Sequence, residues 1–288
     1  MLELRLNNVK WDKYHNVLIP DEPCSKDIHL SKREARLLLK KTGVYFIRYT
    51  SDFDCTEETE FWYVVKDKKS SMEELSANTR SKIRRGSKSC FVKKVSAEFI
   101  ACSGYEVYTK AFERYETELS PVSKEDYYNN IMSVKDDASY EFFAVFENQT
   151  NQMIAYSKNK IQDNVCNYGE IKFIPEFLRL YPSYVLFFEM NNYYLNERMC
   201  KFVVDGARSI NHKTNIQDFL IDKFKFRKAY CKLNIYYSIK VTIAINIVYP
   251  FRRLLERIQS KTINKLKILI IHEEIRRSYN EYMPLSRK

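Results

Sequence analysis

The stretch that decides the fold is residues 141–174, EFFAVFENQTNQMIAYSKNKIQDNVCNYGEIKFI. Its β-branched and aromatic residues predict three strands, at 141–146, 153–161 and 165–174, and the polar turn ENQTNQ joins the first two. Because short polar connections favour antiparallel pairing, this stretch predicts an antiparallel meander.

The residues after the meander predict a helix at 183–199, a strand at 201–205, a second helix at 215–224 and a last strand at 228–237. A long crossover is what parallel neighbours need, so we expect the strand at 201–205 to lie beside the third strand of the meander and parallel to it. The order of elements therefore predicts a mixed sheet with helices.

Two strands are also expected before the meander, at 44–49 (VYFIRY) and 60–66 (EFWYVVK), forming a small sheet across the acidic loop SDFDCTEET. Residues 71–85 predict a helix that Ser71 caps and Gly86 ends. Helical spacing follows at 104–115 and 124–134.

Composition indicates a folded protein without disulfides. The 288 residues are 45% hydrophobic and 15% aromatic, which argues against disorder. The seven cysteines are scattered and form no C-x-x-C pair, so neither a disulfide framework nor a zinc site is expected. The chain has no apolar run near the roughly 20 residues of a membrane span and no signal-peptide pattern at its start, so we expect a cytoplasmic protein.

The net charge of +11 favours anionic partners. Nucleic acid, a nucleotide cofactor, a pyrophosphate-linked precursor and the inner membrane surface all remain open on this ground. A solvated basic face with no specific ligand is an equal alternative.

The element order in residues 140–238 is that of the GNAT acyltransferase core, and three segments carry a narrower resemblance to FemABX-like proteins. TNIQDFLIDKFKFRKAYCKLNIYY (214–237) resembles the closing helix, aromatic-arginine turn and final strand of the GNAT superfamily. SYVLFFEMNNYYLNERMCKFVVDGARSINHKT (183–214) looks like the FemABX-like helix and the strand that ends in Asp-Gly. ELSANTRSKIRRGSKSCFVKKVS (74–96) is similar to that family's basic helix and strand.

The resemblance implies an α/β (α+β) GNAT-like fold, in which helices flank a twisted mixed sheet. It divides the chain into a degenerate GNAT-like portion at 1–95, an acyltransferase core at 96–238 and an amphipathic helical extension at 239–288. It also implies transfer of an acyl or aminoacyl group onto an amine of a cell-envelope glycan or nucleotide-sugar precursor, with acyl-CoA or aminoacyl-tRNA as donor and no metal.

Two departures from the GNAT pattern bear on the donor. The turn that offers glycine N–H groups to the pyrophosphate of coenzyme A reads FIPEFLRLYPSYV (173–185) here and contains no glycine. Ile221 stands where GNAT enzymes commonly have a tyrosine as general acid, and Lys225 stands where they usually have glycine. FemABX-like enzymes likewise diverge at this turn and use aminoacyl-tRNA, a donor that suits a basic surface.

Three residues are candidates for catalysis. Lys223 matches the lysine that FemABX-like proteins hold near the acyl carbonyl in an F-K-x-x-F pattern, where a fixed cation stabilises an oxyanion, although it also reads as a solvated helix-end lysine. Glu170 lies on the third predicted strand and could accept a proton from the attacking amine, or be an exposed strand residue. Asp205 ends an apolar strand, a usual place for functional groups, or caps the following turn.

A second set of residues is predicted to bind the donor or the acceptor. Arg208 and His212 share the loop after Asp205, and a basic helix upstream suits phosphate groups. A solvated loop histidine and a solvated basic helix are the alternatives. The full set is Arg208, His212, Asn215, Tyr184, Arg80, Arg84 and Arg85.

Residues 250–279 predict an amphipathic helix in which basic residues outnumber acidic ones. Such a helix either packs its apolar side on the domain or lies on an anionic membrane surface, and both readings remain open. A second function also remains open, that of a catalytically silent GNAT-like protein that holds RNA or an anionic membrane. The sequence does not predict the oligomeric state.

Overall fold

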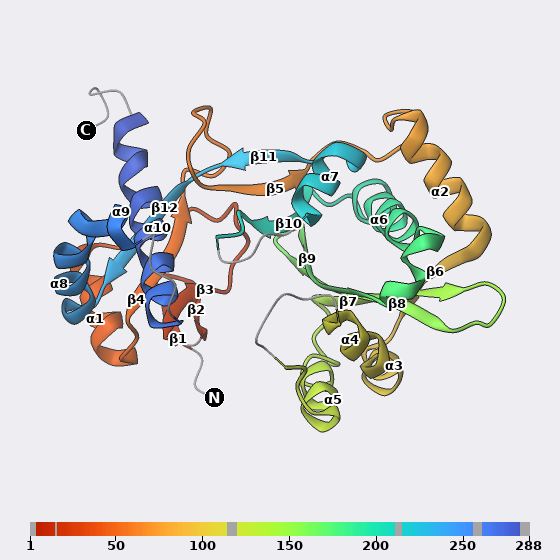
Figure 1. The fold of residues 1–288 in the computed structure, drawn as a ribbon, viewed down its shortest axis with the longest axis horizontal. Helices are drawn as coiled ribbons and strands as arrows, with labels where there is room; N and C mark the ends of the chain where they lie inside the picture. Colours follow the sequence, from red (N-terminus) through yellow and green to blue (C-terminus); the bar gives the residue numbers. More distant parts are fainter. Residues whose placement is uncertain (1–3, 15, 114–119, 211–214, 256–260, 283–288) are drawn as a thin grey trace. The chain divides into compact units, whose positions relative to one another are not determined.

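The computed structural model describes residues 4–14, 16–113, 120–210, 215–255 and 261–282. Within them the strands form two mixed sheets with helices packed against them (Figure 1). The chain divides into two compact units. The first unit combines residues 1–63, 207–214 and 228–288, and the second combines 64–206 and 215–227. The division at residues 95 and 238 rests on composition and resemblance, and it stays a prediction.

The second unit contains the predicted meander. β7 (Tyr140–Glu147), β8 (Met153–Gln162) and β9 (Val165–Phe173) pair antiparallel in chain order. β10 (Phe202–Ala207) pairs parallel with β9, and β6 (Cys90–Val95) pairs antiparallel with β7. These pairings confirm the mixed sheet that the sequence predicts.

Helices cover both faces of this part of the sheet (Figure 1). On one face lie α3 (Ala97–Ser103), α4 (Tyr105–Phe112) and α5 (Lys124–Met132). On the other lies α6 (Pro182–Asn192), with α2 (Ala77–Ser89) packed against it. α6 follows the 3-10 turn η1 (Pro175–Leu180) and continues into the short π-helix η2 (Tyr193–Glu197).

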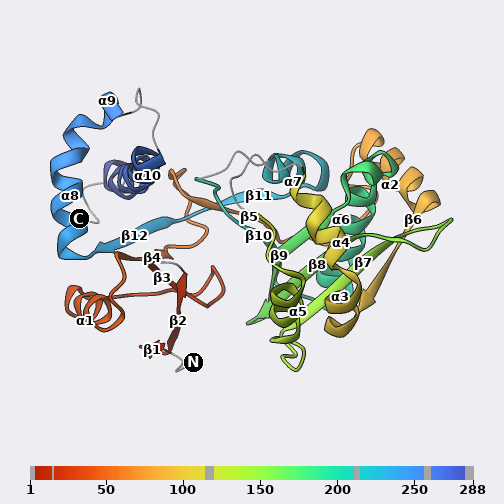
Figure 2. The same ribbon diagram turned by 60° about the horizontal axis from the view of Figure 1, so that its bottom comes forward.

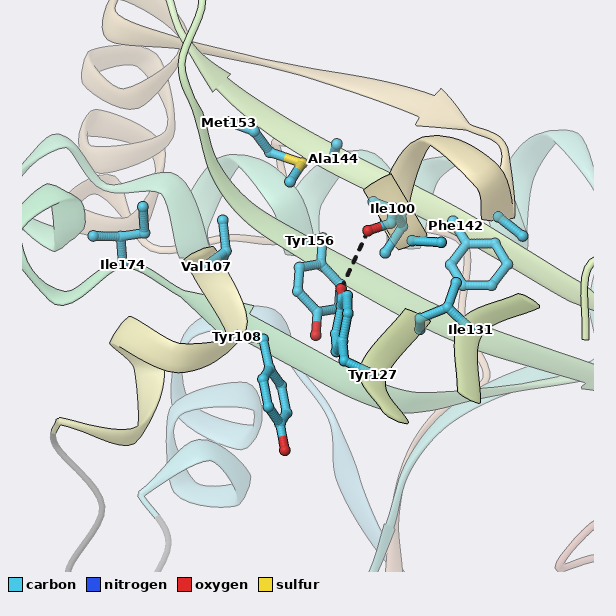
Figure 3. Packing of buried hydrophobic residues seen from close by; sticks show 12 residues of the cluster. Ile100, Val107, Tyr108, Tyr127, Ile131, Phe142, Ala144, Met153, Tyr156 and Ile174 are labelled. Carbon is cyan, nitrogen blue, oxygen red and sulfur yellow. Dashed lines mark hydrogen bonds between the residues drawn. The ribbon is translucent and has the colours of Figure 1, made fainter. Parts of the chain in front are cut away.

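The core on the α3–α5 face is rich in tyrosine (Figure 3). The hydroxyl of Tyr127 donates a hydrogen bond to the Ile100 carbonyl at 3.3 Å, and the ring packs edge-on against Tyr156. Because a buried tyrosine hydroxyl needs a partner, these bonds fix how α3 and α5 lie on the sheet.

The first unit is built on a five-stranded sheet in the order β1-β2-β3-β4-β12. β12 pairs antiparallel with β4 over six residues. α1 (Lys32–Thr42) packs on this sheet and begins at a capping box between Ser31 and Glu34. The strands are β1 (Leu4–Leu6), β2 (Val9–Tyr14), β3 (Val17–Pro20), β4 (Phe46–Ser51) and β12 (Lys232–Tyr237).

Residues 239–255 and 261–282 of this unit are helical, as the sequence predicts. α10 (Lys261–Tyr282) packs on β12 and buries Ile275. Burial lowers the pKa of His272 to about 4, so its ring is neutral, with Nδ1 donating to the Ile268 carbonyl and Nε2 accepting from Arg48. The other helices are α8 (Ile239–Val248), the 3-10 turn η3 (Tyr249–Phe251) and α9 (Arg252–Leu255).

Two strand predictions were wrong. The strands expected at 44–49 and 60–66 do not share a sheet, because β4 pairs with β12 while β5 (Trp62–Lys66) belongs to the seven-stranded sheet β11-β5-β10-β9-β8-β7-β6. The single strand expected at 228–237 is two strands in different sheets, β11 (Arg227–Tyr230) and β12, separated by the buried Cys231.

The bounds of the basic helix also differ from the prediction. α2 begins at Ser76, whose hydroxyl accepts a hydrogen bond from the Thr79 amide at 3.2 Å, and not at Ser71. Gly86 lies inside α2 and does not end it. A Cβ at Gly86 would lie 2.5 Å from Cγ2 of Val185, so glycine is needed here for close packing of α2 on α6.

Gly86→Ala is expected to lower the free energy of unfolding by about 1–3 kcal/mol because it overpacks this helix contact. Without the contact, alanine inside a helix would raise stability by about 1 kcal/mol, so the sign of the change is diagnostic. Urea unfolding measures it, with Ser81→Ala at an exposed position of the same helix as control. A stabilised Gly86→Ala variant would contradict the close approach of α2 and α6.

Lys225 follows α7 (Ile216–Phe224) in the left-handed conformation, with φ of 61°. Since this conformation is unfavourable for residues with a Cβ, Lys225→Gly is expected to raise the free energy of unfolding by roughly 0.5–1 kcal/mol. Lys225→Ala removes the same charge but keeps the strain, so it should bring no gain. Thermal melting of the two variants checks this, and equal effects would show that charge, not backbone strain, is decisive.

Candidate functional site

The parallel strands β9 and β10 separate after a short pairing. Their register joins Phe202 to Val165, Val203 to Cys166 and Val204 to Asn167, and it ends there. Asp205 is the next residue on β10. Asp205 therefore lies just beyond the last paired residues of β9 and β10, and in open α/β sheets such strand ends are a usual place for ligands.

Asp205 is a half-buried carboxyl without a counter-charge. Burial raises its pKa from 3.8 to about 7. Among the residues that the structure describes, none forms a hydrogen bond or an ion pair with it. A carboxyl in this state changes protonation near neutral pH, as a general base or acid must.

Aromatic rings of α6, of η2 and of Phe226, which follows α7, contact Tyr168 on β9. Burial raises the pKa of Tyr168, and the charge of Asp205 contributes to the shift. The Tyr168 hydroxyl donates to Oδ1 of Asn191 on α6 at 2.8 Å, and its ring contacts Phe187 and Phe226. Nδ2 of Asn191 is buried and has no hydrogen-bond partner among the described residues.

Glu170 also lies on β9, but its contacts are on the other face of the sheet. A register shift at Gly169 places Glu170 opposite Lys158 and Tyr168 opposite Asn159, and successive residues of β8 point to opposite faces. Glu170 accepts a hydrogen bond from the hydroxyl of Tyr156, which belongs to the core on the α3–α5 face. The structure therefore does not bring Glu170 and Asp205 together on one face.

Lys158 lies opposite Glu170 on the neighbouring strand β8, on the same face of the sheet. Burial lowers its pKa, and the charge of Glu170 opposes that shift. Its Nζ atom lies 5.0 Å from the centroid of the Tyr140 ring. Glu170, Tyr156 and Lys158 are therefore a coupled polar group of the α3–α5 face.

Lys223 lies on α7, the helix after β10, and Asn215 lies just before it. Lys223 is in the last turn of α7, half-buried, and in the described part of the chain it has no hydrogen bond or ion pair. Asn215 precedes α7 without a capping side-chain hydrogen bond and is exposed. His212, which the sequence analysis included, lies outside the described residues.

The basic helix α2 and the start of α6 form one cation-aromatic cluster. Nζ of Lys82 donates to the Tyr184 hydroxyl at 3.2 Å, and the Arg85 guanidinium lies 4.9 Å from the centroid of the Tyr181 ring. Arg84 and Arg85 are exposed. The structure thus places Tyr184, Arg84 and Arg85 in one region.

Two other predicted binding residues have structural contacts. Arg80 donates to the Leu75 carbonyl at 2.6 Å, at the start of α2. Arg208 pairs with the Glu60 carboxylate at 2.8 Å, and its guanidinium lies 4.7 Å from the centroid of the Trp62 ring. Both arginines hold the fold locally, so neither needs a ligand to explain its position.

The first turn of α6 does not fit the pyrophosphate of coenzyme A. Pro182 is the first helical residue and has no amide N–H, and the amides of Tyr184 and Val185 already contact the Tyr181 carbonyl at 3.1 and 3.3 Å. A Cβ on Gly86 of α2 would lie 3.0 Å from that same carbonyl, so α2 closes this end of the helix. In the described part of the chain, His, Cys, Asp and Glu side chains form no group of three or more that could hold a metal ion.

Several residues of the site are not among those that the sequence predicts. Tyr156 and Lys158 are two residues apart on β8, so the alternation of side chains along a strand places them on one face. The sequence alone could have predicted this. Tyr168 and Asn191 are joined only by the packing of α6 on the sheet, for which the sequence holds no local signal.

No family model matches the sequence, and no curated protein matches it either. Among solved structures, the crystal structure of FemX resembles this chain with a TM-score of 0.56 at 10% identity, covering 82% of this chain and 85% of FemX. The C-terminal domain of a putative lysylphosphatidylglycerol synthetase from Agrobacterium fabrum gives a TM-score of 0.49 at 10% identity, over 82% of each chain. At these identities the likeness concerns the fold alone: the chain has a mixed α/β, GNAT-like fold similar to that of FemX.

Proposed function

We propose that the protein is an acyl- or aminoacyltransferase that moves an activated acyl group onto an amine of a cell-envelope glycan or nucleotide-sugar precursor. The observation that carries this proposal is Asp205, a half-buried carboxyl whose pKa desolvation raises to about 7, at the point where the pairing of β9 with β10 ends. The FemX-like fold supports it, since the FemABX-like proteins that the sequence resembles catalyse aminoacyl transfer.

In the proposed reaction Asp205 acts as general base. Its carboxylate accepts a proton from the attacking amine as the new C–N bond forms, and the ester C–O bond of the donor breaks, with the leaving oxygen taking up a proton. Holding amine and ester together supplies much of the rate increase. Lys223 is the candidate for stabilising the oxyanion, and Glu170 is the alternative base if the acceptor reaches the α3–α5 face.

We favour aminoacyl-tRNA over acyl-CoA as the donor. The closed first turn of α6 lacks the cradle that coenzyme A uses, whereas the exposed arginines of α2 suit a polyanion. The same closed turn, with Ile221 in place of the usual tyrosine, favours the second candidate function, a silent GNAT-like protein that binds RNA or an anionic membrane.

Asp205→Asn is expected to stabilise the protein at pH 8 but not at pH 4. The raised pKa means that between pH about 4 and 7 the unfolded state ionises this group while the native state keeps it protonated, so the wild type loses stability as pH rises, by up to roughly 4 kcal/mol. The variant cannot ionise and escapes this loss. Urea unfolding across this pH range checks it, with Asp218→Asn, an exposed carboxylate on α7, as control. A stability difference between Asp205→Asn and wild type that does not vary with pH would remove Asp205 as the neutral-pH base.

Arg84→Glu/Arg85→Glu is expected to weaken tRNA binding by about tenfold or more at physiological salt. The slope of log affinity against log salt concentration should fall by the amount that about two lost phosphate contacts give. Arg33→Glu/Arg36→Glu, an equal charge change at exposed positions of α1, should have a small effect. Filter binding measures tRNA affinity, and a thermal-shift assay with coenzyme A and acetyl-CoA should give no stabilisation.

Transfer itself is tested by incubating the protein with labelled aminoacyl-tRNA and nucleotide-sugar precursors and following the label. Label in the precursor that disappears in Asp205→Asn supports the transferase. Specific tRNA binding without any transfer would favour the silent binding protein, and stabilisation by acetyl-CoA would return acyl-CoA as the donor.

A further inference from the structure

The outer side of α8, η3 and α9 carries a row of exposed apolar side chains. Each is between 56% and 81% exposed. They are three or four residues apart, so they lie along one side of a continuous helical path. We name as the apolar stripe the residues Ile239, Ile243, Ile247, Phe251 and Leu254.

The inner side of α8 is apolar as well. Ile245 is buried, and α8 packs beside β12 in the first unit (Figure 2). A surface helix of a globular protein normally turns polar residues outward, and a helix that is apolar on both sides needs a second apolar environment. Exposed apolar side chains gathered in this way mark an interaction site.

The charged side chains on the segment that carries the stripe are all positive, and the one neighbouring carboxylate that pairs with them in the described part of the chain is Glu274 of α10. Residues 238–255 contain Lys240, Arg252 and Arg253 and no aspartate or glutamate. Arg252 is paired with Glu274 at 2.9 Å, while Lys240 and Arg253 are exposed. Two copies of such a face would repel each other, whereas a negatively charged surface would attract both.

We propose that the apolar stripe, with Lys240 and Arg253 at its margins, is a docking surface for an anionic lipid bilayer. The apolar side chains enter the boundary between head groups and acyl chains, and the two cations contact lipid phosphates. None of the described helices is long and apolar enough to cross a membrane, which fits a helix that lies in the interface. The proposal does not depend on the acyl transfer proposed above.

The inference differs from the reading of the C-terminal residues by sequence alone. The sequence predicts that the helix at 250–279 either packs on the domain or lies on a membrane surface, and Ile270, Ile275 and Tyr279 of α10 are buried. The outward apolar side chains belong mainly to α8, which precedes that segment.

The test is co-sedimentation of the full chain with vesicles of phosphatidylcholine that contain about 30% phosphatidylglycerol. The wild type is expected to bind these vesicles at low salt and to bind less at about 0.5 M salt. Ile243→Gln/Ile247→Gln should lower binding at least about tenfold, because it removes two apolar side chains from the stripe. Lys240→Gln/Arg253→Gln should remove the preference for phosphatidylglycerol over pure phosphatidylcholine vesicles.

The control is Leu37→Gln/Tyr45→Gln, which removes two exposed apolar side chains elsewhere in the first unit. It should bind as the wild type does, and unchanged melting temperatures will show that all variants are folded. Absence of wild-type binding, or equal binding by Ile243→Gln/Ile247→Gln, overturns the proposal. Analytical ultracentrifugation without lipid gives the remaining outcome: a dimer that the same double variant dissociates would make the stripe a self-association surface and overturn membrane docking.

Discussion

The pairing of β10 with β9 over only three residues is the constraint on which the second unit depends. Parallel neighbours need a long connection, and η1, α6 and η2 supply it, so the helices on that face follow from the pairing. Beyond the last paired residues, β9 and β10 no longer exchange backbone hydrogen bonds. The Asp205 carboxyl on β10 lies there, and water solvates it poorly. The raised pKa of Asp205 therefore has the same origin as the end of the pairing between β9 and β10.

Much of the fold could be predicted from the sequence because its signals are local. Residues 141–174 contain residues typical of strands, separated by short polar turns. The strands β7, β8 and β9 lie where this pattern predicts them. The pairing of β4 was missed because its partner β12 lies far along the chain, with Phe46 opposite Tyr237. Gly86 was misread as a helix end because a glycine that permits close helix packing looks the same in sequence as one that ends a helix.

Less of the candidate site could be predicted, because its properties arise from tertiary packing. The position of Asp205 after an apolar strand was a usable signal, but its burial depends on residues brought by other elements. The face of the sheet on which Glu170 lies depends on the register shift at Gly169, because this shift interrupts the alternation of side chains along β9. Arg208 was read as a ligand-binding residue because its partner Glu60 is 148 residues away in the chain.

The chain order of the first unit has a consequence for how the protein is made. β4 is made well before β12 and α10, which pair with it and cover it. Until then the nascent chain carries an unpaired strand edge with apolar residues such as Ile47, a template for wrong pairing between chains. In the chain, the second unit lies between these two segments and can form first, so the first unit closes only after β12 and α10 have been made.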